Sequence, residues 1–244
     1  GLRVRGPHGV PGEVRGLDLP DIDITSLESV RRVLLTLKPK IIINAAAYTD
    51  VDGCEANVDQ AMEVNGEGVG LLALTAREIG AKLVQISTDY VFDGRKGTPC
   101  LEDDPVGPLS VYGESKLAGE LNAAMAPEFL IVRTQWLYGI HGKNFVETML
   151  RLAGEKSELS VVDDQIGSPT WSYDLALTIK ALLDKGCVGT YHAANSGFCS
   201  WNAFAKAIFA EAGRAVTVNS MTTAQLARPA RRPLLSPAPS ATKA

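Results

Sequence analysis

A tyrosine and a lysine four residues apart, Tyr112 and Lys116, form the pair of side chains in this sequence best suited to proton transfer. In a helix of about 3.6 residues per turn they lie next to each other on one face. A free phenol has a pKa of about 10, which is too high for easy proton exchange at neutral pH. A nearby ammonium favours the phenolate, so we expect Lys116 to lower the pKa of Tyr112. Such a pair can act as a general acid for a carbonyl or a general base for an alcohol.

A hydroxyl from a third residue strengthens this interpretation. Tyr-x-x-x-Lys arises by chance in many proteins, and a packed tyrosine ring beside a solvated lysine is the ordinary alternative. Thr88 follows an apolar stretch and lies 24 residues before Tyr112. Two preorganised hydroxyl donors stabilise a carbonyl oxygen that gains negative charge. Together the three residues predict a carbonyl-reducing site, and the packed-tyrosine alternative is the weaker one.

The segments around these residues alternate between strand and helix signals. Apolar runs predict strands at residues 14–19, 40–47, 82–87, 129–133, 159–162 and 190–194. Apolar residues at helical spacing predict helices at residues 27–37, 71–79, 112–125, 144–155, 173–185 and 201–212. Strands that alternate with helices in this way pair in parallel through right-handed crossovers. The sequence therefore predicts an α/β fold.

Three local details accompany these elements. Thr25 and Glu28 have the spacing of a capping box at the start of the first predicted helix. The continuous apolar run Ile41–Ile43 suits a strand that is buried on both faces. From Ala227 onward, four prolines within eleven residues predict a loop or a disordered end rather than a helix.

Composition and charge narrow the class of protein. The 244 residues carry 24 Lys and Arg against 28 Asp and Glu, with 45% hydrophobic and 21% charged residues, which is ordinary globular usage. No run approaches the roughly 18 apolar residues of a membrane span, and the first residues lack a signal-peptide core. No basic block suggests nucleic acid. Four cysteines without a Cys-x-x-Cys pair and three histidines disfavour a disulfide scaffold or structural zinc. We expect a soluble, cytoplasmic enzyme or binding protein.

Two polar segments follow predicted strands at the edge where parallel sheets bind ligands. Small residues in Asn44–Thr49 would let a flat or extended ligand approach the backbone, although tight helix–sheet packing explains them equally well. Ser87–Tyr90 places four polar residues after an apolar strand, which taken alone is more often a turn than a site.

At this level of detail the sequence resembles the extended short-chain dehydrogenases/reductases, and most closely the dTDP-4-dehydrorhamnose reductase family. Six stretches carry the resemblance and keep the family's order across roughly residues 17–235: Asp23–Thr25, Asn44–Asp52, Ser87–Gly94, Tyr112–Glu120, Arg133–Tyr138 and Asp164–Thr170. Six blocks in order are far more specific than any one of them. The resemblance implies a Rossmann-like, doubly wound parallel sheet with a small C-terminal substrate-binding lobe.

The resemblance also implies a reaction and a role for each matched residue. NADPH or NADH would reduce the C4 keto group of dTDP-4-dehydro-L-rhamnose to give dTDP-L-rhamnose. Tyr112 would donate the proton, Lys116 would hold the nicotinamide ribose, and Thr88 would hydrogen-bond the substrate oxygen. The sugar pocket would include Thr88, Asp89, Tyr90 and Trp136. The cofactor would lie along Asp23, Ile24, Ala46, Ala47, Tyr48, Thr49, Tyr112 and Lys116.

The two ends of the chain depart from the family pattern. Gly6, Gly9 and Gly12 have the spacing of a phosphate-binding turn, yet a strand from Val14 leaves no room for the helix that should follow them. We therefore expect a coincidental match and a chain that begins near the end of the family's first helix, with a degenerate glycine motif as the open alternative. The family's closing helix is also expected to be absent. The predicted domains are a Rossmann-like domain at 1–138 and a lobe at 139–244, with 170–195 packing back on the sheet.

Alternatives to this reductase remain at the level of sequence. A non-catalytic relative, similar to the regulatory subunit of methionine adenosyltransferase, would fit the expected loss of the phosphate-binding turn. A reductase for another deoxysugar nucleotide, such as a streptose precursor, would keep the same chemistry. Asp18 would favour NADH over NADPH if it points at the ribose, although members of the family can use both cofactors. A homodimer, and Mg²⁺ at its contact, are implied by the family resemblance alone.

Overall fold

A four-stranded parallel sheet forms the centre of the larger part of the molecule. The computed structural model describes residues 14–234. The sheet has the order β1-β2-β3-β8, with strands β1 (Ile41–Asn44), β2 (Lys82–Thr88), β3 (Glu128–Thr134) and β8 (Gly189–His192). Every pairing in it is parallel, with Thr88 opposite Thr134 and Arg133 opposite His192. The predicted α/β fold is confirmed.

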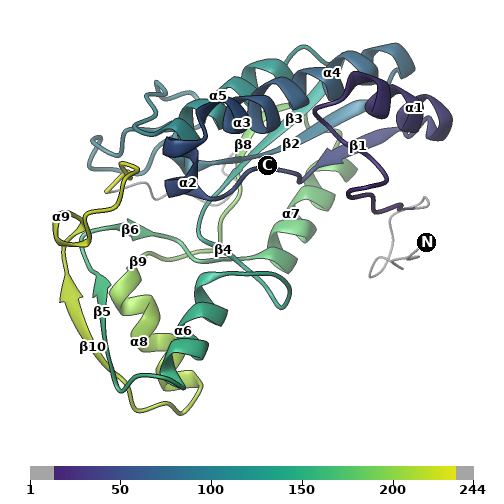
Figure 1. Cartoon of the computed structure of the whole chain (residues 1–244). Coiled ribbons are helices and arrows are strands. Elements are labelled where there is room, and N and C mark those ends of the chain that lie inside the picture. The colour runs from purple at the N-terminus through teal and green to yellow at the C-terminus, as the bar shows by residue number, and fades with distance from the viewer. Residues whose placement is uncertain (1–13, 235–244) are drawn as a thin grey trace.

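Helices cover both faces of this sheet (Figure 1). On one face lie α1 (Leu27–Leu37), α4 (Gly68–Ile79) and α5 (Val111–Ala123), and on the other lies α7 (Ser172–Asp184). Because successive strand residues point to opposite faces, each central strand contributes to two cores. Leu83 and Ile131 pack with α1 and α4, whereas Val84 and Leu130 pack with α7.

Three short helical segments connect β1 to α4, and the sequence analysis did not predict them. They are α2 (Val51–Ala56), α3 (Val58–Met62) and a π-helical turn, η1 (Glu63–Glu67). Asp50 caps α2, because its Oδ1 accepts the N–H of Gly53 at 3.0 Å. Segments of five or six residues are too short to show a helical period in the sequence.

A smaller group of elements forms the lower part of Figure 1 and has its own hydrophobic core. Strands β5 (Glu158–Val162) and β10 (Thr217–Met221) pair in parallel, and helices α6 (Phe145–Ala153) and α8 (Trp201–Glu211) pack beside them. Two short pairings adjoin this group: β4 (Leu137–Tyr138) with β7 (Thr170–Trp171), and β6 (Ile166–Gly167) with β9 (Cys199–Ser200).

Beyond the short helix α9 (Thr223–Leu226), residues 228–234 reach Asp52 of α2 and form what we term the C-terminal strap. Asp52 accepts hydrogen bonds from Arg228, the Ala230 amide and Arg232. At the end of the strap, the Leu234 carbonyl accepts the N–H of Ile166 at 2.9 Å. The strap therefore links α2 to β6.

Several local predictions were wrong. Residues 14–19 are irregular, and Ser26 caps α1 instead of Thr25, whose hydroxyl donates to Asp23. The run in β1 is not buried on both faces, since Ile41 and Ile43 are 41% and 52% exposed. Ile42 packs into the core with α1 and α4, whereas its two neighbours point to the other face, where the core with α7 includes residues of β2, β3 and β8 but none of β1.

Some expectations stay untested. Gly6, Gly9 and Gly12 lie outside the described residues, as does everything after Leu234 where the closing helix was expected to be absent. The division into residues 1–138 and 139–244 stays a prediction; within 170–195, α7 and β8 lie with the sheet. Among the helices of residues 14–234, none has the length and apolar character needed to cross a bilayer.

Candidate active site

The predicted catalytic residues gather at the carboxyl ends of the parallel strands. Thr88 ends β2, and its register partner Thr134 ends β3. Tyr112 and Lys116 lie on α5, which packs against β2 and the turn that follows it. This edge of the sheet is where ligands bind in open α/β folds.

Thr88 organises the turn directly after β2. Its Oγ1 accepts the N–H of Tyr90 at 3.2 Å and so caps the 3₁₀ turn η2 (Asp89–Val91). The same hydroxyl donates to Oδ1 of Asp89 at 3.0 Å, and both residues are buried. Burial raises the pKa of Asp89 from its ordinary value of 3.8 to about 7, against the lowering effect of these hydrogen bonds. A carboxyl group that changes charge near neutral pH therefore touches the Thr88 hydroxyl.

Tyr112 lies in the first turn of α5, beside this hydroxyl. Ser110 caps the helix by accepting the N–H of Gly113 at 3.2 Å. A Cβ on Gly113 would lie 2.4 Å from the carbonyl oxygen of Tyr90, so only glycine lets the helix start this close to η2. The rings of Tyr112 and Tyr90 meet edge to face, with centroids 5.4 Å apart, and the Tyr112 hydroxyl hydrogen-bonds Thr88.

The expected lowering of the Tyr112 pKa was wrong for this structure. Burial, then the Asp89 carboxylate and the Tyr90 phenol, raise the pKa of Tyr112 and outweigh the lowering effect of its hydrogen bond with Thr88. The Lys116 ammonium does not offset them, because it is directed at the strand backbone and donates to the Ile86 carbonyl at 2.7 Å. Tyr112 therefore holds its proton firmly at neutral pH.

Lys116 is itself buried, with 4% of its surface exposed. Burial lowers its pKa to about 8, and the Glu120 carboxylate one turn further along α5 acts in the opposite direction. An ammonium has three N–H donors, of which the Ile86 carbonyl takes one. The Ile86 carbonyl therefore leaves two of these donors for other partners.

The predicted cofactor residues lie in two segments. Ala46, Ala47, Tyr48 and Thr49 follow β1, where the buried Asn65 of η1 accepts the Tyr48 N–H at 2.8 Å and donates to its carbonyl at 3.0 Å. Ala46 and Thr49 are exposed, so no helix packs tightly on these small residues. The second segment lies just before α1. There the Asp23 carboxylate accepts two hydrogen bonds from Thr25, and Ile24 packs into the core formed with α1 and α4.

Trp136 follows β3 and is held by side chains that the sequence analysis missed. Its φ of +46° is unusual for a residue other than glycine. Its ring stacks on Trp201 of α8 with centroids 3.6 Å apart and planes 12° from parallel. A Cβ on Gly167 would lie 2.4 Å from the same ring. Nothing in the spacing of Trp136 and Trp201 indicates this stack, since β4 to β9 separate them in the chain.

Arg232 of the C-terminal strap also reaches the site. Its Nη2 donates to Oδ2 of Asp52 at 2.9 Å, and its guanidinium hydrogen-bonds the hydroxyl of Tyr90. The arginine and the Ala230 amide lower the pKa of Asp52 despite its partial burial. The sequence analysis did not single out Arg232, because 180 residues separate it from Asp52.

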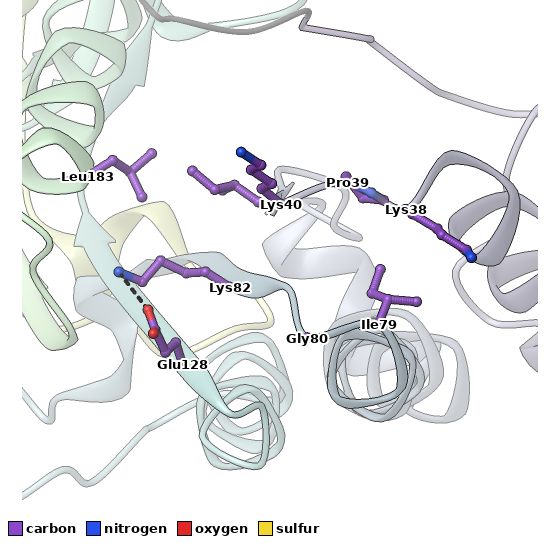
Figure 2. A pocket seen from close by; sticks show the side chains of 9 residues that line it. Lys38, Pro39, Lys40, Ile79, Gly80, Lys82, Glu128 and Leu183 are labelled. Carbon is purple, nitrogen blue, oxygen red and sulfur yellow. Dashed lines mark ion pairs between the residues drawn. The ribbon is translucent and has the colours of Figure 1, made fainter.

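A pocket of about 400 Å³ lies at the other end of the sheet (Figure 2). Its lining residues Lys40, Lys82 and Glu128 are at the amino ends of β1, β2 and β3. Lys82 forms an ion pair with Glu128 at 3.3 Å there. The pocket is therefore separate from the Thr88 and Tyr112 hydroxyls.

A parallel α/β sheet with Thr88, Tyr112 and Lys116 at its carboxyl edge defines a Rossmann-like oxidoreductase of the extended short-chain dehydrogenase/reductase class. The comparison with family models is consistent with this class, because the model described as the RmlD substrate binding domain matches residues 8–240. The chain belongs to that family. The resemblance found in the sequence is thereby confirmed.

Similar proteins include named reductases. The chain is 45% identical to the spore coat polysaccharide biosynthesis protein SpsK of Bacillus subtilis over 92% of this chain and 79% of that protein. It is 41% identical to the dTDP-4-dehydrorhamnose reductase of Escherichia coli, over 86% and 75% of the two chains. The crystal structure of a Bacillus anthracis dTDP-4-dehydrorhamnose reductase in complex with NADP superposes with a TM-score of 0.88 at 44% identity, covering 90% and 78% of the chains.

Proposed function

We propose that this protein reduces the C4 keto group of dTDP-4-dehydro-L-rhamnose to form dTDP-L-rhamnose, with NADPH or NADH as the hydride donor. The observation that carries the proposal is the contact between the Tyr112 and Thr88 hydroxyls at the carboxyl edge of the sheet. Reductases of this name, 41–44% identical over most of the chain, support the choice of substrate. Nothing in these comparisons supports a regulatory subunit.

Each residue has a distinct part in the proposed reaction. Tyr112, protonated at neutral pH, gives its proton to the keto oxygen as negative charge develops there. Thr88 donates a second hydrogen bond to the same oxygen, so the charge is stabilised by two fixed donors. Lys116 holds the ribose hydroxyls with the N–H groups that the Ile86 carbonyl leaves free. Asp89, Tyr90 and Trp136 line the sugar pocket.

The residues present fit the nicotinamide half of such a cofactor. Ala46 and Thr49 leave the backbone after β1 accessible, and Asn65 fixes the course of that segment through Tyr48. When bound, NADPH or NADH supplies the hydride. Ala47, Asp23 and Ile24 would also lie along it. The proposal leaves open whether the cofactor is NADPH or NADH. It also includes a cytoplasmic location and a homodimer with Mg²⁺ at its contact.

Tyr112→Phe tests the assignment directly, because it removes the proton donor and leaves the ring. We expect turnover of dTDP-4-dehydro-L-rhamnose, followed by NADPH absorbance, to fall about 100-fold or more, while nucleotide-sugar affinity changes little. The control is Tyr173→Phe on the exposed surface of α7, which should keep full activity. Turnover above about a tenth of the wild-type value in Tyr112→Phe would contradict the role of Tyr112.

A further inference from the structure

A buried ion pair lies behind the candidate active site, one helical turn beyond Lys116. Nε of Arg133 on β3 donates to Oε1 of Glu120 on α5 at 2.9 Å, and its Nη2 donates to Oε2 at 2.7 Å. The Ser87 hydroxyl on β2 donates to the same Oε1 at 2.5 Å. Glu120 and Arg133 are only 4% and 6% exposed. Hydrogen bonds from two strands therefore fix this carboxylate.

Arg133 has further partners that hold it independently of Glu120. Its Nη1 donates to the carbonyl of Glu102 at 3.1 Å, and its guanidinium lies 5.0 Å above the centre of the Phe92 ring. Cation–π contacts of this kind favour a fixed orientation of the guanidinium. Arg133 thus provides a rigid support for the carboxylate.

Stability alone does not explain these buried charges. Taking two charges out of water costs about as much as their attraction returns, and apolar side chains of similar volume often stabilise a fold equally well. Apolar side chains would not supply a negative charge near Lys116, nor an acceptor for Ser87. The ion pair is therefore explained by the negative charge that it places near Lys116 and by the acceptor that it offers to Ser87.

The position of the carboxylate connects the elements that carry the catalytic groups. Glu120 is four residues after Lys116 and eight after Tyr112, so the three share one side of α5. Its partner Ser87 lies between Ile86, whose carbonyl accepts the Lys116 ammonium, and Thr88. The Glu120 carboxylate therefore joins the helix of Tyr112 to the strand of Thr88.

We propose that Glu120, supported by Arg133, is a positioning residue of the reductase site that fixes α5 against β2 and keeps the buried Lys116 ammonium charged. The catalytic consequence rests on the proposed function, whereas the electrostatic coupling does not. Since a nearby negative charge raises the pKa of an ammonium, removing it lowers the pKa of Lys116 below the value of about 8.

Other titratable groups near this cluster can be separated from Lys116. His192 on β8 packs edge-on against Phe92, and burial lowers its pKa to about 4, so it is neutral above pH 6. Glu102 accepts the His192 N–H at 3.2 Å through its carboxylate. Asp89, beyond the end of β2, changes charge at about pH 7. A group that titrates between pH 7 and pH 9 and disappears in Lys116→Met is then Lys116.

The test measures the Lys116 titration without using catalysis. In protein labelled with ¹³C at lysine Cε, the Lys116 signal is assigned by its loss in Lys116→Met. We expect its midpoint to fall by about one pH unit in Glu120→Gln. The control Glu155→Gln breaks the exposed pair with Arg151 and should leave the midpoint unchanged. A Glu120→Gln midpoint within about 0.3 pH unit of the wild-type midpoint, which is less than about a third of the expected shift, overturns the proposed coupling.

The double variant Glu120→Gln/Arg133→Met tests the role of Arg133 as the support of the carboxylate. Glu120→Gln leaves a buried guanidinium unpaired and should lower the unfolding temperature, whereas the double variant regains most of that loss. We expect the lowered midpoint in Glu120→Gln alone. The double variant is used for stability, because Arg133→Met also removes a positive charge that disfavours the Lys116 ammonium and so raises its midpoint again. A double variant that is no more stable than Glu120→Gln overturns the role of Arg133 as the support of the carboxylate.

Ser87→Ala tests the positioning half, because it keeps the charge and removes the bond to β2. We expect an unchanged Lys116 midpoint and a turnover about tenfold below wild type, with little change in KM. Wild-type turnover would overturn the positioning role. If the wild-type chain reduces no nucleotide sugar while Glu120→Gln still lowers the Lys116 midpoint, the proposed function fails and the coupling stands.

Discussion

Asp89→Asn is the most informative single substitution, because it changes the charge beside Thr88 and almost nothing else. A threonine hydroxyl has one hydrogen, and in the structure it is directed to Oδ1 of Asp89 at 3.0 Å. While that bond persists, Thr88 cannot donate to a keto oxygen. A protonated Asp89, or an asparagine amide in its place, can donate to Oγ1 instead and free the Thr88 hydrogen for the substrate.

The pKa of Asp89 gives the sign and size of the effect on stability. Burial raises it from 3.8 to about 7, so between these two pH values the folded state binds a proton that the unfolded state has lost. The contribution of this group to stability is therefore present below pH 4 and is lost as the pH rises to about 7. At 1.36 kcal/mol for each unit of pKa, the loss amounts to about 4 kcal/mol as an upper value.

Urea unfolding of the wild type and Asp89→Asn at pH 5, 6, 7 and 8 measures this contribution. We expect the variant to gain stability over the wild type by about 2–3 kcal/mol between pH 5 and pH 8, because asparagine has no charge to bury. In steady-state assays, turnover of the wild type should fall as the pH rises through about 7, and Asp89→Asn should lack this decline. Asp21→Asn, at an exposed position, is the control.

Two results would refute the reasoning about Asp89. If the stability difference between the wild type and Asp89→Asn is the same at pH 5 and pH 8, the carboxyl group does not change charge in this range. If that difference changes as expected but the decline of turnover near pH 7 persists in Asp89→Asn, the direction of the Thr88 hydrogen does not control the reaction.

Three further substitutions follow from close contacts in the structure. Gly119→Ala places a Cβ 2.2 Å from a backbone carbonyl oxygen of η1 and should lower the free energy of unfolding by about 1–3 kcal/mol, whereas Gly70→Ala, 3.4 Å from a flexible side chain, should not. Gly167→Ala displaces the Trp136 ring, so we expect KM for the nucleotide sugar to rise about tenfold and the tryptophan fluorescence to change. An unchanged KM would exclude Trp136 from the sugar pocket. Asp52→Asn weakens the C-terminal strap and should speed its cleavage by trypsin, while equal cleavage rates would show that the strap is held elsewhere.

The sequence was sufficient for the elements with a clear period. Helices α4 and α5 and strands β2 and β3 were predicted to within a few residues, because their apolar positions and the stop at Gly80 are local signals. The short segments α2, α3 and η1 were missed because less than two turns shows no period. The capping prediction at Thr25 failed because Ser26 offers an equivalent hydroxyl one residue later.

The residues of the candidate site were recognisable, but their electrostatics were not. Tyr112 and Lys116 share a helix face, as their spacing indicates. The direction of the Tyr112 pKa depends on burial and on Asp89, which are tertiary properties that no spacing reveals. The supports from Trp201 and Arg232 come from elements far away in the chain, so only the fold brings them to Trp136 and Tyr90.

The raised pKa of Tyr112 bears on the direction of the proposed reaction. A general base that oxidises an alcohol must lose its proton first, and burial beside Asp89 opposes that loss. A general acid that reduces a ketone must instead arrive protonated, which these surroundings favour at neutral pH. The ammonium of Lys116 is directed at the Ile86 carbonyl and not at the phenol, so it does not promote the phenolate. The electrostatics around Tyr112 therefore keep the phenol protonated at neutral pH, which is the form that a general acid needs and not the form that a general base needs.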